Sequence, residues 1–108
     1  MFDWLRCEYP LPDKHMQDHR FQTKDTPAQF MFNYTITASG RLIFHRTKML
    51  PPVDGWAEEV PVGDVDTGFH GAISFYDDDE DGNWHEYRAR FVDGQVQEII
   101  LDYRGGSQ

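Results

Sequence analysis

The 108-residue sequence has one cysteine and no long apolar run. A single cysteine, Cys7, excludes an intramolecular disulfide, and we expect it to be a small buried apolar side chain in a reducing cytoplasm. No run approaches the ~18 apolar residues of a membrane-spanning helix. The first residues also lack the basic-then-apolar order of a signal peptide. These absences together predict a cytoplasmic protein without a membrane span.

Basic residues are also scarce, with ten Lys and Arg against nineteen Asp and Glu, which gives a formal charge of −9. Nucleic-acid binding needs a positive surface that replaces the counterions of the phosphates, so we predict no direct contact with nucleic acid. A negative charge instead suits a basic protein partner, because opposite fields speed encounter and reject wrong partners. The same charge also keeps a protein soluble without any partner.

Motifs that carry catalysis are missing as well. The sequence has no glycine-rich phosphate loop, no nucleophile elbow and no recognisable pair of catalytic carboxylates. His15 and His19 have the spacing that places two imidazoles on one side of a helical turn, as in zinc sites, but no glutamate of the H-E-x-x-H type and no evident third ligand accompany them. We interpret both histidines as exposed polar residues and predict that the protein is not an enzyme.

What the sequence does contain is material for β-structure, with 39% hydrophobic and 15% aromatic residues. Period-two alternation predicts strands at 30–37, 41–49, 69–76, 84–92 and 95–103, with shorter or looser ones at 2–9, 21–24 and 59–62. We therefore predict one mainly β domain over 1–108, with a frayed tail at 104–108. Its two hairpin or meander units, joined by long loops, form either a small antiparallel sheet or a two-sheet sandwich.

The strongest local signal is the dipeptide Asp93-Gly94 between two predicted strands. Such a dipeptide is typical of a two-residue type I′ turn, in which both residues have positive φ. Continuing the pairing outward from this turn places His85 opposite Asp102. It also places Glu98 on the apolar face, which predicts a bulge or a sheet edge near that residue.

An acidic loop at 77–82 separates two of the predicted strands. Asp77, Asp79, Asp81 and Gly82 match the first half of a calcium loop, in which oxygen ligands alternate before a glycine. The bidentate acid expected at the twelfth position is replaced by Arg88, and strands rather than helices flank the loop. Three interpretations stay open: a solvated hairpin tip, an acidic prong that faces a partner, or a calcium site formed by Asp77, Asp79 and Asp81.

The partner-binding interpretation assigns a role to acidic and aromatic residues together. The acids would set the association rate and its salt dependence, while an aromatic side chain would supply most of the lasting affinity. Trp56, in the loop at 51–68, either anchors that loop to the core or is exposed for contact with a partner. The predicted partner-binding residues are Asp77, Asp78, Asp79, Glu80 and Asp81, with Trp84 or Trp56 as the apolar anchor.

Four short segments of the sequence, in this order, resemble a group of short uncharacterised phage and prophage proteins. They are CEYPLP at 7–12, FQTK at 21–24, YTIT at 34–37 followed by GRL at 40–42, and WHEY at 84–87. The resemblance implies a small accessory product acting in a bacterial cytoplasm, and such proteins often bind and block host proteins. We therefore expect a protein-binding module, an inhibitor of a basic host or defence protein. The alternatives are a calcium- or small-ligand-binding β module that uses the loop at 77–82, and a structural or assembly component.

Overall fold

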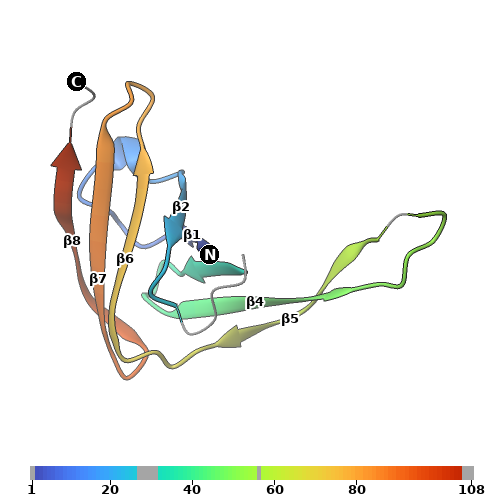
Figure 1. Ribbon diagram of the computed structural model, residues 1–108. Helices are drawn as coiled ribbons and strands as arrows, with labels where there is room; N and C mark the ends of the chain where they lie inside the picture. The colour runs from blue at the N-terminus through green and yellow to red at the C-terminus, as the bar shows by residue number, and fades with distance from the viewer. Residues whose placement is uncertain (1, 27–31, 56, 106–108) are drawn as a thin grey trace.

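The computed structural model describes residues 2–26, 32–55 and 57–105. It confirms the mainly β class and arranges the strands in one eight-stranded sheet, in the order β5-β4-β3-β1-β2-β6-β7-β8 (Figure 1). The elements are β1 (Asp3–Cys7), the 3₁₀ helix η1 (Lys14–Met16), β2 (Arg20–Thr23), β3 (Asn33–Ile36), β4 (Leu42–Met49), β5 (Glu59–Asp66), β6 (Gly71–Asp78), β7 (Trp84–Val92) and β8 (Gln95–Gly105).

The sheet is mixed, so the expectation of a purely antiparallel sheet was wrong in one pair. β1 pairs with β3 in parallel, with Leu5 opposite Tyr34, while the other pairings among the described strands are antiparallel. β2 returns along one edge of β1, and the chain then crosses to the other edge of β1 before β3 begins. Such a crossover brings the chain back in the same direction, which sequence alternation alone does not reveal.

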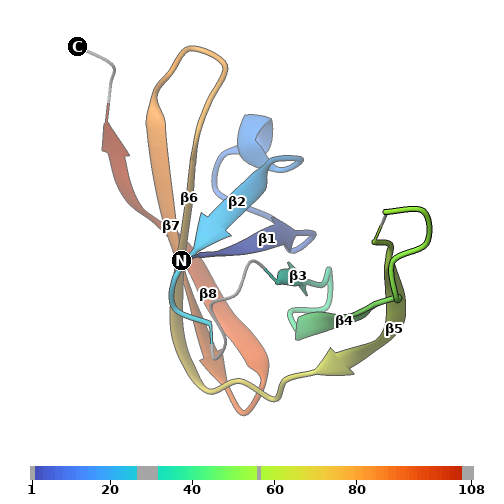
Figure 2. The same ribbon diagram turned by 45° about the vertical axis from the view of Figure 1, so that its right-hand side comes forward.

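The sheet curls strongly, and this curling makes a core possible without a second sheet. β6, β7 and β8 stand away from β4 and β5, with β1, β2 and β3 between them (Figure 2). The turn after β3 meets the start of β8, where the Val96 amide donates to the Gly40 carbonyl at 2.8 Å. The inner face of the curl holds the core: Leu5, Cys7, Phe21, Tyr34, Ile36, Leu42, Ile73, Phe75, Tyr87, Ala89, Phe91 and Val96.

Met16 on η1 and Leu11 cover this core from one end, and both are buried. The segment 13–20 around η1 is polar except for Met16. Met16 packs into the core, and the Gln17 side chain hydrogen-bonds the backbone at Cys7, Tyr9 and Leu11. Both contacts hold the short helix against the sheet. This position brings the residues of η1 next to the loop between β6 and β7.

The hairpin of β7 and β8 confirms the turn and the bulge that the sequence predicts. Asp93 and Gly94 have φ values of 50° and 85°, as a type I′ turn requires. The register shifts between Arg90 and Phe91, because Arg90 pairs with Glu98 whereas Phe91 pairs with Val96. The extra residue lies next to Glu98, where the bulge was expected.

The predicted pairing of His85 with Asp102 was wrong. A second register shift follows Glu86, and together the two shifts place His85 opposite Arg104. A bulge inserts a residue without breaking the alternation of the partner strand, so counting outward from the turn cannot detect it. β8 also continues through Arg104 and Gly105, which corrects the frayed tail predicted to begin at 104.

β4 and β5 continue beyond the sheet as a two-stranded projection that we call the arm, residues 46–62 (Figure 1). β5 extends further than the predicted strand at 59–62 because its pairing with β4 continues to Ile43 and Asp66. The predicted strand at 30–37 is shorter in the structure, from Asn33 to Ile36, and its first residues lie outside the described part of the chain. No helix in the described ranges is long and apolar enough to cross a membrane.

Candidate functional site

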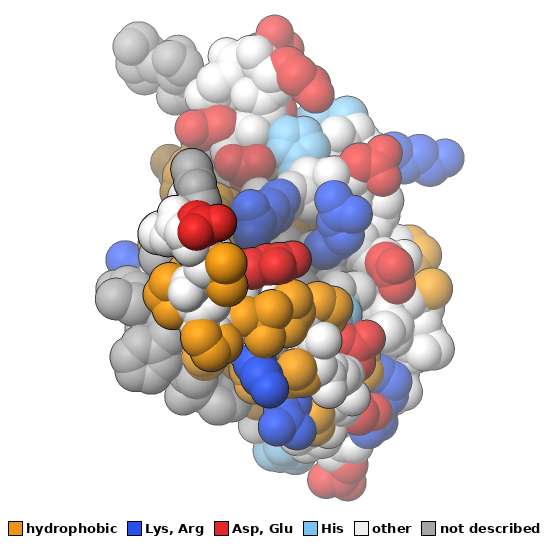
Figure 3. All heavy atoms as spheres, turned by 90° about the vertical axis from the view of Figure 1, so that its right-hand side faces the viewer, with side chains coloured by type: hydrophobic (Ala, Val, Ile, Leu, Met, Phe, Trp, Pro, Cys, Tyr) orange, Lys and Arg blue, Asp and Glu red, His pale blue; other side chains and the backbone are white. Residues whose placement is uncertain are grey.

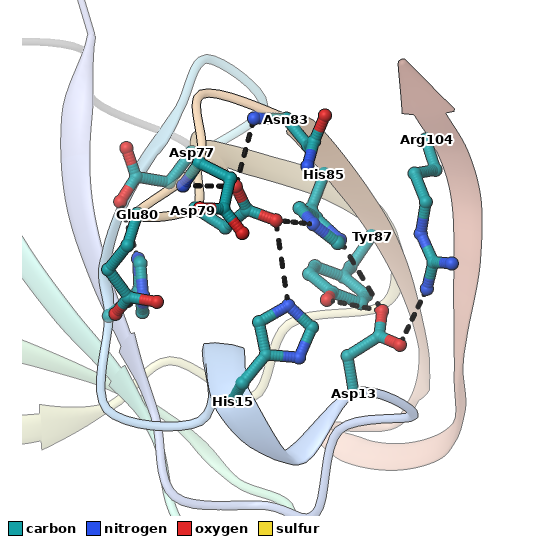
Figure 4. Close-up of polar contacts among 11 residues, drawn as sticks. Asp13, His15, Asp77, Asp79, Glu80, Asn83, His85, Tyr87 and Arg104 are labelled. Atoms are coloured by element: carbon teal, nitrogen blue, oxygen red, sulfur yellow. Dashed lines mark hydrogen bonds and ion pairs between the residues drawn. The ribbon is translucent and has the colours of Figure 1, made fainter. Parts of the chain in front are cut away.

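The acidic loop between β6 and β7 lies against histidines of the same chain. His15 belongs to η1 and His85 comes from β7 (Figure 4). His19 follows η1 in the chain. Tertiary packing of η1 next to the loop brings these groups together from distant parts of the sequence. The loop is therefore the outer side of a histidine–carboxylate cluster.

Asp79 lies at the centre of this cluster. Its Oδ1 accepts hydrogen bonds from the amides of Asp81 and Asn83, both at 2.9 Å, which holds the tip of the hairpin. Its Oδ2 accepts a hydrogen bond from His85 Nε2 at 2.9 Å and lies 3.7 Å from His15 Nε2. The hydrogen bond from His85, and then the amide of Asn83, hold the pKa of Asp79 well below its usual range.

His85 is the most deeply buried of these histidines, with its side chain only 2% exposed. It occupies an inward position on β7, on the same face as Tyr87 and Phe91. Its Nδ1 lies 3.5 Å from Asp13 Oδ2, within ion-pair range, yet that nitrogen has no hydrogen-bond partner among the described residues. A buried ring nitrogen without a hydrogen bond is unusual and requires an explanation.

Asp13 supports the cluster from the side opposite Asp79 (Figure 4). It accepts a hydrogen bond from the Tyr87 hydroxyl and another from Arg104 Nη2, each at 2.8 Å. Burial acts to raise the pKa of Asp13, but the Tyr87 hydrogen bond and the Arg104 charge outweigh it and lower the pKa overall. Burial and the neighbouring Asp13 carboxylate raise the pKa of Tyr87, so its hydroxyl stays a donor.

A second pair lies beside the first. His19 Nδ1 donates to Asp77 Oδ2 at 2.9 Å, and its Nε2 lies 3.8 Å from Glu80 Oε1. The His19 side chain is 18% exposed, so its interpretation as an exposed polar residue was wrong, whereas the His15 side chain is 50% exposed.

The structure does not bring the predicted calcium ligands together. Asp77 is bound to His19, Asp79 turns inward to His85, and Asp81 is exposed at the tip. In the described ranges, the group whose ligand atoms all lie within 4.8 Å of one another is His15, Asp79 and His85. The sequence analysis did not assign His85 to a site, although a histidine on the apolar face of an alternating strand is a detectable signal.

The two predicted aromatic anchors have different outcomes. Trp84 is half-buried and stacks on Tyr76, with ring centroids 5.0 Å apart and an interplanar angle of 25°. It is therefore held against its own sheet. Trp56 lies outside the described residues. Of the five predicted acids, Asp78, Glu80 and Asp81 are exposed.

No protein family, curated protein or solved structure matches this chain. Its function is therefore to be argued from its own surfaces and side-chain clusters. Two features of the described structure carry chemistry or contact area: the histidine–carboxylate cluster and the arm.

Proposed function

We propose that this protein is a small acidic protein-binding module that contacts a basic partner, as an inhibitor of a host or defence protein would. The observation that supports this proposal is the arm. A two-stranded ribbon that extends away from the core contributes little to the core, and its apolar side chains remain open to solvent. Such a projection suits insertion into, or contact with, the surface of another protein.

The apolar side chains of the arm are strongly exposed. Met49 is 58% exposed, Val53 71% and Val62 47%. Leu50, Pro51 and Val53 line a shallow hollow near the end of the arm. Figure 3 looks onto that end and shows hydrophobic side chains gathered together, with Lys and Arg above and below them and Asp and Glu nearby. An apolar centre with a charged rim is the usual composition of a protein-binding surface.

The arm is suited to contact through side chains rather than through strand addition. β5 is the terminal strand of the sheet, and Pro61 removes a backbone donor from it. The register shift between Arg46 and Thr47 distorts the ribbon at the same level. Prolines and bulges of this kind discourage pairing with another strand. The alternative of an assembly component that adds its edge strand to a neighbour is therefore less well supported.

Charge determines the kind of partner. With a formal charge of −9, the protein attracts basic surfaces and repels acidic ones over about a Debye length. The exposed acids at the hairpin tip, Asp78, Glu80 and Asp81, add to this field. In this proposal they speed the approach of a basic partner, and the apolar arm supplies the contact that keeps it bound.

The test uses the tagged protein in a nuclease-treated bacterial lysate with stepwise increases in salt. We expect one stoichiometric basic protein to bind, and the double variant Met49→Ser/Val53→Ser to lose it. Ile100→Ser changes an exposed apolar residue on β8 and is the matched control, which should bind normally. Reversal of Asp78, Glu80 and Asp81 to lysine should slow association by roughly tenfold at low salt.

Two results would contradict the proposal. In one, the arm variant retains the partner as well as the Ile100→Ser control does. In the other, no protein is retained at low salt from any lysate that contains basic host proteins. Circular dichroism of each variant checks that a loss of binding does not reflect unfolding.

A further inference from the structure

We infer that His15, Asp79 and His85 form a binding site for one divalent transition-metal ion, with Zn²⁺ as the representative ion. This site uses no residue of the arm, and the inference does not rest on the protein-binding proposal. It replaces the all-carboxylate calcium site suggested by the sequence with a site of two imidazoles and one carboxylate.

The distances among the three ligand atoms fit such an ion. His85 Nε2 lies 2.9 Å from Asp79 Oδ2, His15 Nε2 lies 3.7 Å from the same oxygen, and the three ligand atoms all lie within 4.8 Å of one another. In a tetrahedral zinc site with bonds of about 2.1 Å, neighbouring ligand atoms are roughly 3.4 Å apart. The ion would take the place of the proton that His85 now shares with Asp79.

The surrounding residues hold two of the ligands in position. Asp79 is fixed through Oδ1 by the amides of Asp81 and Asn83, which leaves Oδ2 to face the two rings. When His85 gives the lone pair of Nε2 to an ion, its remaining ring proton is on Nδ1. Nδ1 faces Asp13 Oδ2 at 3.5 Å, so this carboxylate becomes the acceptor of that proton.

Asp13 is well placed to orient His85. It is itself held by the Tyr87 hydroxyl and by Arg104, so its position does not depend on an ion. A carboxylate behind a ligating histidine fixes the ring and increases its basicity, and this arrangement is general in metal sites. The buried Nδ1 that has no hydrogen bond among the described residues is thereby accounted for.

The ligand types select the class of ion. Calcium and magnesium prefer sets of six or more oxygen ligands, whereas imidazole nitrogen suits zinc, copper, nickel and iron. His85 is buried and Asp79 is mostly buried, but His15 is half-exposed on η1. The site therefore opens to solvent on the His15 side, where water would complete the coordination.

The experiment titrates Zn²⁺ into the full chain after treatment with EDTA, and measures binding by calorimetry and stability by thermal melting. We expect one ion per chain and a Tm higher by on the order of 10 °C at about 100 times the Kd. Ca²⁺ at the same concentration should leave Tm unchanged. Co²⁺ should give the visible absorption of a low-coordinate site with nitrogen ligands.

His15→Gln is the decisive variant, because His15 lies on the solvent side and its loss should not unfold the protein. It should weaken Zn²⁺ binding by well over tenfold. Even the loss of a residue that only hydrogen-bonds a ligand lowers metal affinity by about 10–100-fold. His45→Gln and His70→Gln are matched controls, because each histidine also lies beside a carboxylate but outside the cluster. Asp13→Asn should weaken binding by about tenfold with His15 and His85 in place.

The inference is overturned if Zn²⁺ neither binds nor raises Tm, which would make the cluster a set of internal ion pairs only. It is also overturned if His15→Gln binds Zn²⁺ as tightly as the His45→Gln and His70→Gln controls. Equal effects of Ca²⁺ and Zn²⁺ on Tm would overturn the choice of a transition metal.

Discussion

At the scale of single residues, Cys7 shows how burial controls reactivity. Its side chain is buried on β1, and burial raises the pKa of the thiol from 9.0 to about 12, although a backbone hydrogen bond with Tyr9 acts to lower it. The thiolate is the reactive form of cysteine. The native protein should therefore resist alkylation at a pH where free cysteine reacts.

We expect iodoacetamide to modify native Cys7 slowly at pH 9, and to modify it rapidly once the protein is unfolded in guanidinium chloride. Because the folded pKa lies above the unfolded one, the neutral thiol stabilises the fold fully below pH 9.0. That contribution is lost as the pH rises from 9.0 towards 12. Mass spectrometry of timed samples measures the modification. Equal rates in the native and unfolded states would contradict the prediction.

Asp3 is a residue whose role the sequence did not indicate. It is an acid at a fully buried position of β1, where alternation predicts an apolar side chain. It accepts hydrogen bonds from the Thr26 hydroxyl and from the Phe32 amide. A buried carboxylate of this kind is stable only with such partners, which lie 23 and 29 residues further along the chain. Partners so distant in sequence cannot be inferred from local patterns.

At the scale of elements, the contact between the turn after β3 and the start of β8 depends on a glycine. Gly40 has a φ of +87°, and a Cβ at this position would lie 2.5 Å from the Gln95 side chain and 3.2 Å from Val96 Cβ. Gly55 on the arm has a similar φ of +81°, but a Cβ there would meet no atom of the described residues within 4 Å. Comparing alanine variants of Gly40 and Gly55 therefore separates the stability lost to backbone strain from the stability lost to a steric clash.

Both glycine-to-alanine changes should cost about 1 kcal/mol through the left-handed backbone. Gly40→Ala should cost roughly 1 kcal/mol more than Gly55→Ala, because it also pushes the turn away from β8. Chemical denaturation of both variants measures the difference. Equal losses of stability would show that the closure of the curled sheet tolerates displacement at this point.

The strands themselves were largely predictable, whereas their long-range arrangement was not. The alternation on β7 predicted Trp84–Val92 with both ends correct, and Asp93-Gly94 identified the turn that follows. The bulge near Glu98 was also predicted, but the second bulge, after Glu86, and the parallel pairing of β1 with β3 were not, because neither changes the local alternation. For the site, His15 and Asp79 meet because η1 packs beside the loop. The buried Met16 and the hydrogen bonds of Gln17 hold η1 there, and local patterns do not reveal either contact.

At the scale of the whole molecule, the arm and the rest of the sheet contribute differently to the free energy of unfolding. The core lies within the curl of the sheet, while the arm extends outward with exposed apolar side chains (Figure 1). Little free energy of unfolding should therefore depend on the arm, and most of the binding free energy should depend on it.

Replacing 49–59 by Asn-Gly tests this separation, because Lys48 and Val60 are directly paired and the dipeptide closes a two-residue turn between them. We expect the shortened protein to melt within about 4 °C of the original, as for surface changes of about 0.5 kcal/mol. It should no longer bind the partner. A much larger fall in Tm would show that the arm supports the fold.

Asp79 also links two parts of the surface that the arm does not touch. One carboxylate oxygen holds the backbone of the acidic hairpin tip, and the other faces the rings of His15 and His85. A ligand that shifts the Asp79 side chain at either place changes the free energy of binding at the other place. By thermodynamic reciprocity, any occupant of the histidine side and any basic group bound at the tip alter each other's affinity by the same factor. A single side chain thus connects the histidine side of the cluster to the backbone of the hairpin tip.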